Sequence, residues 1–93
     1  MVIKSFKHKG LRTLFETGSI KGVQSSHANK LLDILDLLNA AKEPRDLGFP
    51  GSFLHPLKGK LKGYWAVRVS GNWRVVFQFS KGDAFDVNYI DYH

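Results

Sequence analysis

The stretch from Trp65 to Phe79, WAVRVSGNWRVVFQF, decides the fold. Apolar and polar residues alternate on both sides of a Gly-Asn pair, which is the pattern of two strands joined by a tight hairpin. A further alternating run, with Phe85, Val87 and Tyr89 at every second position, predicts a third strand. We therefore expect an antiparallel sheet in the C-terminal half of the chain.

The length of the hairpin loop sets the register of these strands, because a shift of one residue moves every side chain to the other face. A two-residue loop, Gly71-Asn72, would pair Ser70 with Trp73 and mix apolar and polar side chains on each face. A three-residue loop pairs Val69 with Trp73 instead. It collects the apolar residues on one face, namely Trp65, Val67, Val69, Trp73, Val75, Phe77 and Phe79. We therefore predict the three-residue loop.

The same register pairs Arg68 with Arg74 on the opposite, half-polar face. Like charges directly opposite each other on a sheet are unfavourable, so this placement needs a compensating group. One candidate is an anionic ligand held between the two guanidinium groups. The other is a carboxylate from the next strand, such as Asp86. The sequence leaves both interpretations open.

The N-terminal segment reads as a short strand followed by a short helix. Val2 to Phe6 is the candidate strand. Leu11, Leu14 and Phe15 indicate the helix, and Gly18 is suited to end it in left-handed geometry. A loop follows this helix.

A second helix is the clearest local prediction. Its apolar residues follow 3,4,3 spacing, and polar residues mark the opposite side. The apolar positions are Ala28, Leu31, Leu35 and Leu38, and the polar ones are Asn29, Asp33 and Asp36. Ser25 or Ser26 is the expected cap, and the helix should finish before Pro44, with a loop from there to Gly51. Two helices before a run of strands predict an α+β fold in which the helices cover one face of the sheet.

The composition favours one small cytoplasmic domain, residues 1–93, with a polyanionic partner. Ninety-three residues leave no room for a second core, and no stretch reads as a signal peptide or a membrane span. There is no cysteine for a disulfide or a thiolate metal site. The formal charge of +6 favours a polyanion, which could be RNA, DNA, a membrane surface or an acidic protein, although a basic soluble surface without a partner has the same charge.

The densest local signal is LHPLKGKLKGYW, from Leu54 to Trp65. Its lysines Lys58, Lys60 and Lys62 occupy alternate positions, so an extended chain would point all three the same way, toward phosphates. The other interpretation is a solvated loop whose lysines protect an edge strand.

His55 and the chain end IDYH carry the residues best suited to acid–base chemistry. RNA is cut without a metal when a base removes the 2′-hydroxyl proton, cations stabilise the phosphorane and an acid protonates the leaving oxygen. His55 and His93 are a candidate acid–base pair, although a lone histidine before a proline is usually structural. Asp91 and Tyr92 would orient or assist them. The four histidines show no ligand spacing, so we expect no metal ion and no cofactor.

The chain end carries one conflict. Strict alternation from Phe85 puts Asp91 and His93 on the core side of the sheet and Tyr92 beside the arginines. We therefore expect a bulge or a strand end near Ile90 to redirect them.

Three segments resemble the HigB toxins of the RelE superfamily: IKSFKHKGL from Ile3, LHPLKGKLKGYWAVRVSGNWRVVFQF from Leu54 and DAFDVNYIDYH from Asp83. The resemblance runs nearly end to end and is weakest between Thr17 and Phe53. It implies a RelE-like fold with two N-terminal helices on a small, mainly antiparallel sheet. It also implies metal-free mRNA cleavage in the ribosomal A site, at the 30S decoding site. The implied partner is a HigA-type helix-turn-helix antitoxin, through which alone the toxin would contact operator DNA.

The resemblance also assigns site residues. The catalytic positions of the family fall on His55, Asp91, Tyr92 and His93. The expected RNA or phosphate contacts are Lys58, Arg74 and, matching many members, Arg68, with Lys60 added from the lysine row. Which residue is base and which is acid stays open. The alternative to an enzyme is a basic module that binds nucleic acid or blocks the ribosome without cutting.

Overall fold

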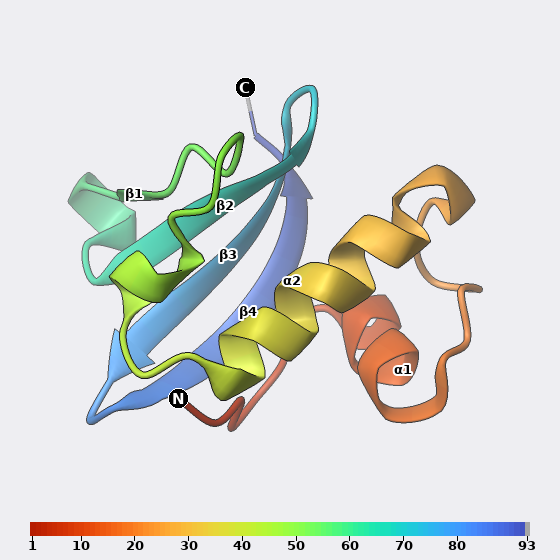
Figure 1. Ribbon diagram of the computed structural model, residues 1–93, viewed down its shortest axis with the longest axis horizontal. Coiled ribbons are helices and arrows are strands. Elements are labelled where there is room, and N and C mark those ends of the chain that lie inside the picture. Colours follow the sequence, from red (N-terminus) through yellow and green to blue (C-terminus); the bar gives the residue numbers. More distant parts are fainter. Residues whose placement is uncertain (93) are drawn as a thin grey trace.

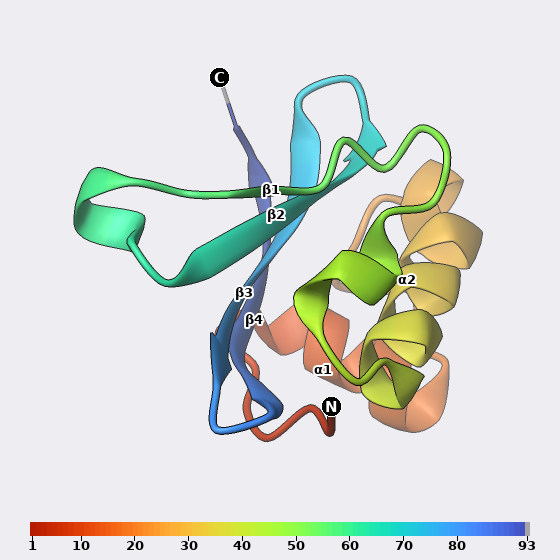
Figure 2. The same cartoon turned by 60° about the vertical axis from the view of Figure 1, so that its left-hand side comes forward.

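Two α-helices lie against one face of a four-stranded antiparallel sheet in the computed structural model, which describes residues 1–92 (Figure 1). The elements are α1 (Lys9–Thr17), α2 (Ala28–Ala40), β1 (His55–Pro56), β2 (Tyr64–Ser70), β3 (Trp73–Ser80) and β4 (Asp83–Asp91). Single 3₁₀ turns lie in the connections: η1 (Ser25–His27), η2 (Pro44–Leu47) and η3 (Gly59–Leu61). The sheet order is β1-β2-β3-β4, and Figure 2 shows both α-helices on the same side of it. The predicted α+β architecture is confirmed.

Both ends of α1 have identifiable caps. At the start, Nδ1 of His8 accepts a hydrogen bond of 3.1 Å from the backbone N–H of Leu11. At the end, Gly18 has a φ of 80°, and its N–H donates to the carbonyl oxygen of Leu14 at 2.9 Å. The predicted helix and its left-handed glycine end are both confirmed.

The start of α2 differs from the prediction. Ser25 and Ser26 do not cap the helix, because they belong to the 3₁₀ turn that leads into it. The position before the first helical residue is His27, whose ring is buried and hydrogen bonded to Tyr89 in the core instead of to the helix. A preceding 3₁₀ turn lets backbone carbonyls take over part of the capping. The end of α2 before Pro44 is as predicted.

The β2–β3 hairpin has the predicted register and a loop that is shorter than predicted. Arg68 lies opposite Arg74, as the three-residue loop requires. At the turn, however, Ser70 lies opposite Trp73, so the loop is the Gly-Asn pair alone and the predicted loop length is wrong. A β-bulge at Val69 reconciles the two observations, because an extra residue in β2 shifts the register there.

A second bulge, in β4, moves Phe85 away from the core. The β3–β4 register shifts next to Gln78, where Asp86 has a positive φ of 53°. Phe85 therefore lies opposite Gln78 on the other face of the sheet. Val87 and Tyr89 are buried in the core as predicted, whereas the prediction for Phe85 is wrong.

The N-terminal segment contacts the outer edge of β4 without forming the predicted strand at Val2–Phe6. It makes isolated parallel bridges at Ile3 and at Phe6. The ladder between them is interrupted because the N–H of Asp86 donates to the hydroxyl oxygen of Ser5, at 2.8 Å, instead of to a backbone carbonyl. The β4 bulge thus explains why this segment is not a continuous strand.

The main core lies between the helices and the sheet. It contains the sheet face predicted from alternation: Val67, Val69, Val75 and Phe77 are buried, and Trp65, Trp73 and Phe79 pack against them. A smaller apolar cluster of Leu57, Ala66 and Val76 lies on the opposite face. Within residues 1–92 we find no helix with the length and apolar character needed to cross a membrane.

Candidate active site

The sheet face turned away from the helices carries four of the predicted site residues. His55 of β1 lies opposite Ala66 of β2, and Arg68 lies opposite Arg74. Ala66 and Arg68 are two residues apart in β2, so His55, Arg68 and Arg74 have their side chains on the same face. Tyr92 continues the alternation of β4 onto the same face and is exposed. We call the surface formed by His55, Arg68, Arg74 and Tyr92 the open face.

A single carbonyl oxygen holds both guanidinium groups of the open face. Nη1 of Arg74 donates to the carbonyl oxygen of Gly71 at 2.7 Å, and Nε of Arg68 donates to the same oxygen at 3.3 Å. A shared acceptor offsets part of the repulsion between two cations that lie opposite each other. The predicted arginine pair is therefore confirmed, and the turn that joins its two strands stabilises it.

Asp86 does not neutralise this pair, so the interpretation that named this carboxylate is wrong. Its carboxylate accepts hydrogen bonds from the hydroxyls of Tyr64, at 3.2 Å, and Ser5, at 3.4 Å. Burial, and secondarily the bond to Asp86, raises the pKa of Tyr64 above its ordinary value, which keeps that hydroxyl a donor. Ion pairs found within residues 1–92 involve other arginines: Arg12–Glu16 and Arg45–Glu43.

The arginine pair retains an unused hydrogen-bond donor. Within the described part of the chain, no group accepts a hydrogen bond from the buried Nε of Arg74. A buried N–H without a partner costs free energy, and because this nitrogen is buried, an anion would interact with the charge and the terminal nitrogens of the guanidinium group instead. The pair is therefore suited to hold a phosphate.

The backbone fixes the protonation of one ring nitrogen of His55. Nδ1 lies 2.8 Å from the carbonyl oxygen of Phe53. Because a carbonyl oxygen can only accept, Nδ1 carries a hydrogen, and Nε2 is the nitrogen left to exchange a proton with a ligand. Ala66, opposite His55, is the next residue on the same face of β2 from Arg68. The structure thus brings His55 and the arginine pair together.

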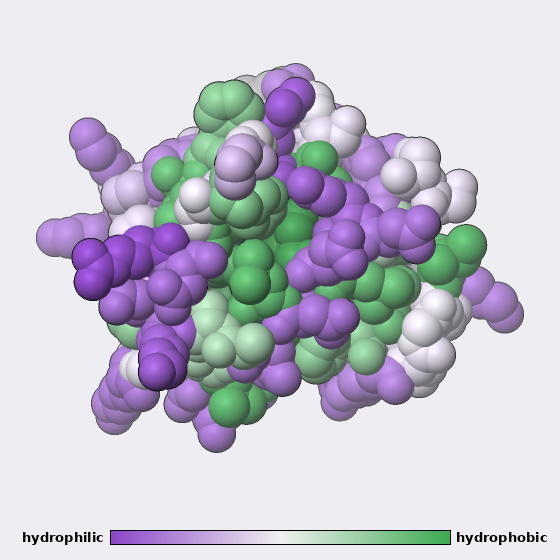
Figure 3. All heavy atoms as spheres, in the orientation of Figure 1, coloured by the Kyte–Doolittle hydropathy of each residue, from purple (hydrophilic) through white to green (hydrophobic). Residues whose placement is uncertain are grey.

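The lysine segment does not form the predicted row. The chain turns at η3, and Gly59 and Gly63 have positive φ values of 66° and 93°, so the alternation of an extended strand is lost. Lys58, Lys60 and Lys62 are exposed on the loop between β1 and β2. Figure 3 shows hydrophilic side chains projecting at the left of the molecule, where Figure 1 draws this loop. The lysines form a basic rim beside the open face. The segment is the solvated loop of the second interpretation, and the same-facing row of an extended chain does not form.

Asp91 lies on the helix side of the sheet, away from the arginine pair. It pairs with Trp73, and the β3–β4 pairing runs through Ile90 without a bulge, so the redirection expected for Asp91 is wrong. The strand ends at Asp91, and the redirection expected for His93 falls outside the described residues. Asp91 and Tyr92 therefore lie at the same end of the sheet with their side chains on opposite faces. His93, the fourth predicted catalytic residue, lies outside the described residues.

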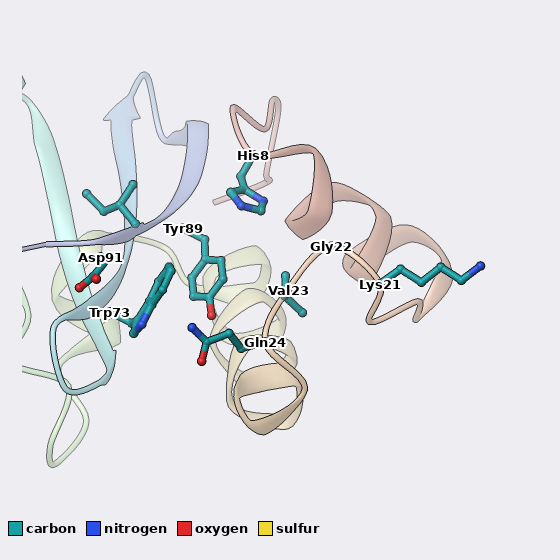
Figure 4. A pocket seen from close by; sticks show the side chains of 9 residues that line it. His8, Lys21, Gly22, Val23, Gln24, Trp73, Tyr89 and Asp91 are labelled. Atoms are coloured by element: carbon teal, nitrogen blue, oxygen red, sulfur yellow. The ribbon is translucent and has the colours of Figure 1, made fainter.

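Asp91 also lines a hollow that the sequence reasoning missed (Figure 4). Its volume is about 570 Å³, and its walls are the sheet end, His8 and the loop from Lys21 to Gln24. The rings of Trp73 and Tyr89 form one wall, with their centroids 4.5 Å apart. Trp73, Tyr89 and Asp91 have their side chains on the same face of the paired strands β3 and β4. This alternation is the signal in the sequence that points to the hollow.

Burial shifts the pKa values of two titratable groups in this hollow. Burial raises the pKa of Tyr89 above its ordinary value and lowers the pKa of His8 below its own. The hydroxyl of Tyr89 is hydrogen bonded to Nδ1 of His27 at 2.5 Å. Tyr89 and His8 therefore stay neutral near neutral pH, and Lys21 and Asp91 supply the charges of the lining.

Comparison with known proteins identifies the family. The family model for HigB-like toxins, described as the RelE-like toxin of the type II toxin-antitoxin system HigB, matches residues 4–93. The chain is 48% identical over 92 residues to the Endoribonuclease HigB of Proteus vulgaris, covering 99% of this chain and 100% of that protein. It is 36% identical over 90 residues to Toxin HigB-1 of Vibrio cholerae, covering 95% and 94%. The chain therefore belongs to the HigB-like family of RelE-like toxins from type II toxin-antitoxin systems.

Proposed function

We propose that this chain is a ribosome-dependent mRNA endonuclease that cuts mRNA in the ribosomal A site by metal-free acid–base catalysis. The endoribonuclease activity rests on family membership and on the near full-length match to the Proteus vulgaris enzyme. Membership of a type II system implies an antitoxin partner. We propose that this antitoxin is of the HigA type, that operator DNA is reached only through the complex and that the protein works in the cytoplasm.

The observation that carries the chemistry is the arginine pair beside His55, whose Nδ1 is hydrogen bonded to the carbonyl oxygen of Phe53. A base takes the proton of the 2′-hydroxyl, whose oxygen attacks the adjacent phosphate, and an acid protonates the departing 5′ oxygen. Arg68 and Arg74 would stabilise the negative charge that builds up on the phosphorane. Nε2 of His55 is available for one of the two proton transfers. We assign the other transfer to the chain end, where His93 stands.

The chain end defines how the substrate approaches. Asp91 and Tyr92 flank the same end of the sheet from its two faces. An RNA strand that crosses this end would meet Tyr92 on the arginine side and Asp91 on the side of the hollow. In this arrangement Tyr92 assists the reaction at the phosphate, and Asp91 orients the nucleotide that lies beyond it. Lys58 and Lys60, on the exposed rim, attract the RNA backbone.

The ribosome has a physical role in this proposal. A small sheet with its site on one open face does not enclose a codon, and in-line attack requires a well-aligned 2′-oxygen, phosphorus and 5′ oxygen. The decoding site would supply that alignment while the toxin supplies charge and proton transfer. Isolated RNA should therefore be a poor substrate.

The test is a translation-coupled cleavage assay with purified 70S ribosomes, which compares the wild type with His93→Ala and with ribosome-free RNA. We expect cuts within A-site codons that require both the ribosome and His93, with a loss of about 100-fold or more in rate for the variant. Ribosome binding by His93→Ala should stay near that of the wild type. If the wild-type reaction stalls translation without producing new RNA ends, the protein is a module that blocks the ribosome and not an enzyme.

A further inference from the structure

Phe53 combines exposure with backbone strain. Its side chain is 65% exposed, and its φ of 46° lies in the left-handed region that bulky residues rarely adopt. The flanking chain is firmly held: the carbonyl oxygen of Ser52 accepts from the N–H of Arg68 at 2.7 Å, and His55 pairs with β2. Neither burial nor local preference accounts for an aromatic residue here, which is the situation in which retained strain indicates function.

The ring of Phe53 belongs to the open face. The guanidinium carbon of Arg68 lies 5.4 Å from the ring centroid, within the range of a cation–π contact. The carbonyl oxygen of the same residue holds Nδ1 of His55. Phe53 therefore contacts a phosphate-binding cation through its side chain and the acid–base histidine through its backbone.

We propose that the exposed ring of Phe53 is a stacking platform for an unpaired nucleobase of the RNA, next to the phosphate held by Arg68 and Arg74. Every base has a π-face, so such a platform positions a nucleotide without reading its identity. This inference rests on the proposed function and adds a positioning residue to it. Stacking here would hold the ribose beside Nε2 of His55.

The surroundings of the ring favour RNA over an apolar protein segment. Arg68 contacts the ring, and Arg74 lies opposite Arg68 in the sheet. A nucleotide brings an aromatic face and a phosphate to the same place, and it therefore satisfies both the ring and the cations. An apolar side chain would cover the ring and leave the arginine without an anion.

The test couples the residue to the base. Ribosomes are programmed with an mRNA whose A-site codon is 2′-O-methylated and cannot be cut, and each nucleotide of that codon is made abasic in turn. The wild type should lose about 5- to 150-fold in affinity at one abasic position, the range measured for stacking on an aromatic side chain. Phe53→Leu keeps an apolar side chain without a π-face, so its affinity should not fall at that abasic position. Phe53→Trp keeps a π-face, so its affinity should fall there as in the wild type.

The controls separate this inference from the proposed function. Val2, which is 52% exposed at the far edge of the sheet, provides a matched variant, and Val2→Ala should behave as the wild type. Equal abasic penalties in the wild type and Phe53→Leu, or no binding by the wild type, would overturn the stacking platform. So would a Phe53→Leu effect confined to antitoxin binding. If unmethylated mRNA is cut in the same system, the proposed function survives such a result; if it is not cut, the function fails on its own.

Discussion

Three non-glycine residues with left-handed backbone lie within residues 1–92, and they differ in how the fold explains them. Lys81, with a φ of 51°, precedes Gly82 in the β3–β4 turn, where tight hairpins require such angles. Asp86, with a φ of 53°, forms the β4 bulge and bonds to Ser5 there. At Phe53 the chain before β1 has one residue more than β2, because the carbonyl oxygen of Ser52 accepts from Arg68 while His55 pairs with Ala66. Its left-handed backbone costs about 1–2 kcal/mol, and unlike the other two residues it holds a large exposed ring in that conformation.

Substitution at Phe53 separates the strain from the role of the ring. Phe53→Gly and Phe53→Ala both remove the ring and its contact with Arg68, but only glycine adopts a positive φ without a steric cost. We expect the glycine variant to have the larger free energy of unfolding, by about 1 kcal/mol, measured by urea denaturation. An alanine variant that is equally stable or more stable would show that the left-handed backbone is not a feature of this site.

At the scale of elements, spacing located the helices and strands, and long-range bonds decided the details. The 3.6-residue and 2-residue periods placed α1, α2 and the three long strands. The bulge at Asp86 could not be predicted, because its N–H bonds to Ser5, 81 positions away in the sequence. The sequence left two interpretations open for the segment after β1 for another reason: glycine allows both extended and left-handed backbone, so Gly59 and Gly63 in the lysine segment fitted either geometry.

The cap of α1 makes that helix sensitive to pH. Nδ1 of His8 accepts from the N–H of Leu11, so protonation of this nitrogen removes the acceptor. Burial lowers the folded-state pKa of His8 below its ordinary value of 6.5. The unfolded chain therefore binds the proton more tightly than the folded protein. The stability that neutral His8 contributes is present above about pH 6.5 and is lost as the pH falls through the lower folded-state pKa.

His8→Asn tests this cap, because asparagine supplies an acceptor that does not titrate. The free energy of unfolding of the wild type should fall by more than that of the variant between about pH 7 and pH 5. The difference should approach about 1 kcal/mol, the usual contribution of a cap. His8→Ala, which lacks the acceptor at every pH, should be destabilised by a similar amount already at neutral pH. Parallel pH profiles for the wild type and His8→Asn would contradict the capping role.

At the scale of the whole molecule, the register of the sheet determines how much of the candidate site is visible in the sequence. Alternation alone predicted that Arg68, Arg74 and Tyr92 share a face, and the structure confirms the arginine pair. Alternation also placed Asp91 on the core side, where the structure has it. The hollow beside Asp91 escaped prediction because it needs the loop around Gly22 to meet the sheet end, and no periodic pattern encodes that contact.

The close approach of two glycines explains why that loop lies where it does. A Cβ on Gly22 would lie 2.5 Å from Cα of Gly10 in α1, and a Cβ on Gly10 would lie 2.3 Å from the carbonyl oxygen of Gly22. Both distances are shorter than real contacts, so the loop docks on α1 through backbone alone. The two faces of the sheet thus differ: a loop and helices enclose one, and the arginine pair lies on the other.

This asymmetry predicts where the net charge of +6 acts on RNA. If phosphates bind the open face, Arg74→Gln should remove about one phosphate contact and reduce the slope of log Kd against log salt by about 0.7 for a single strand. Lys30→Gln changes the charge equally, but Lys30 lies on α2 over the ring of Phe49, so its slope should match the wild type. Fluorescence anisotropy with a 2′-O-methylated oligonucleotide at several salt concentrations measures the slope for the wild type and for each of the two variants. Equal decreases in slope for the two variants would mean that RNA responds to the charge of the whole surface and that the open face is not a specific phosphate-binding site.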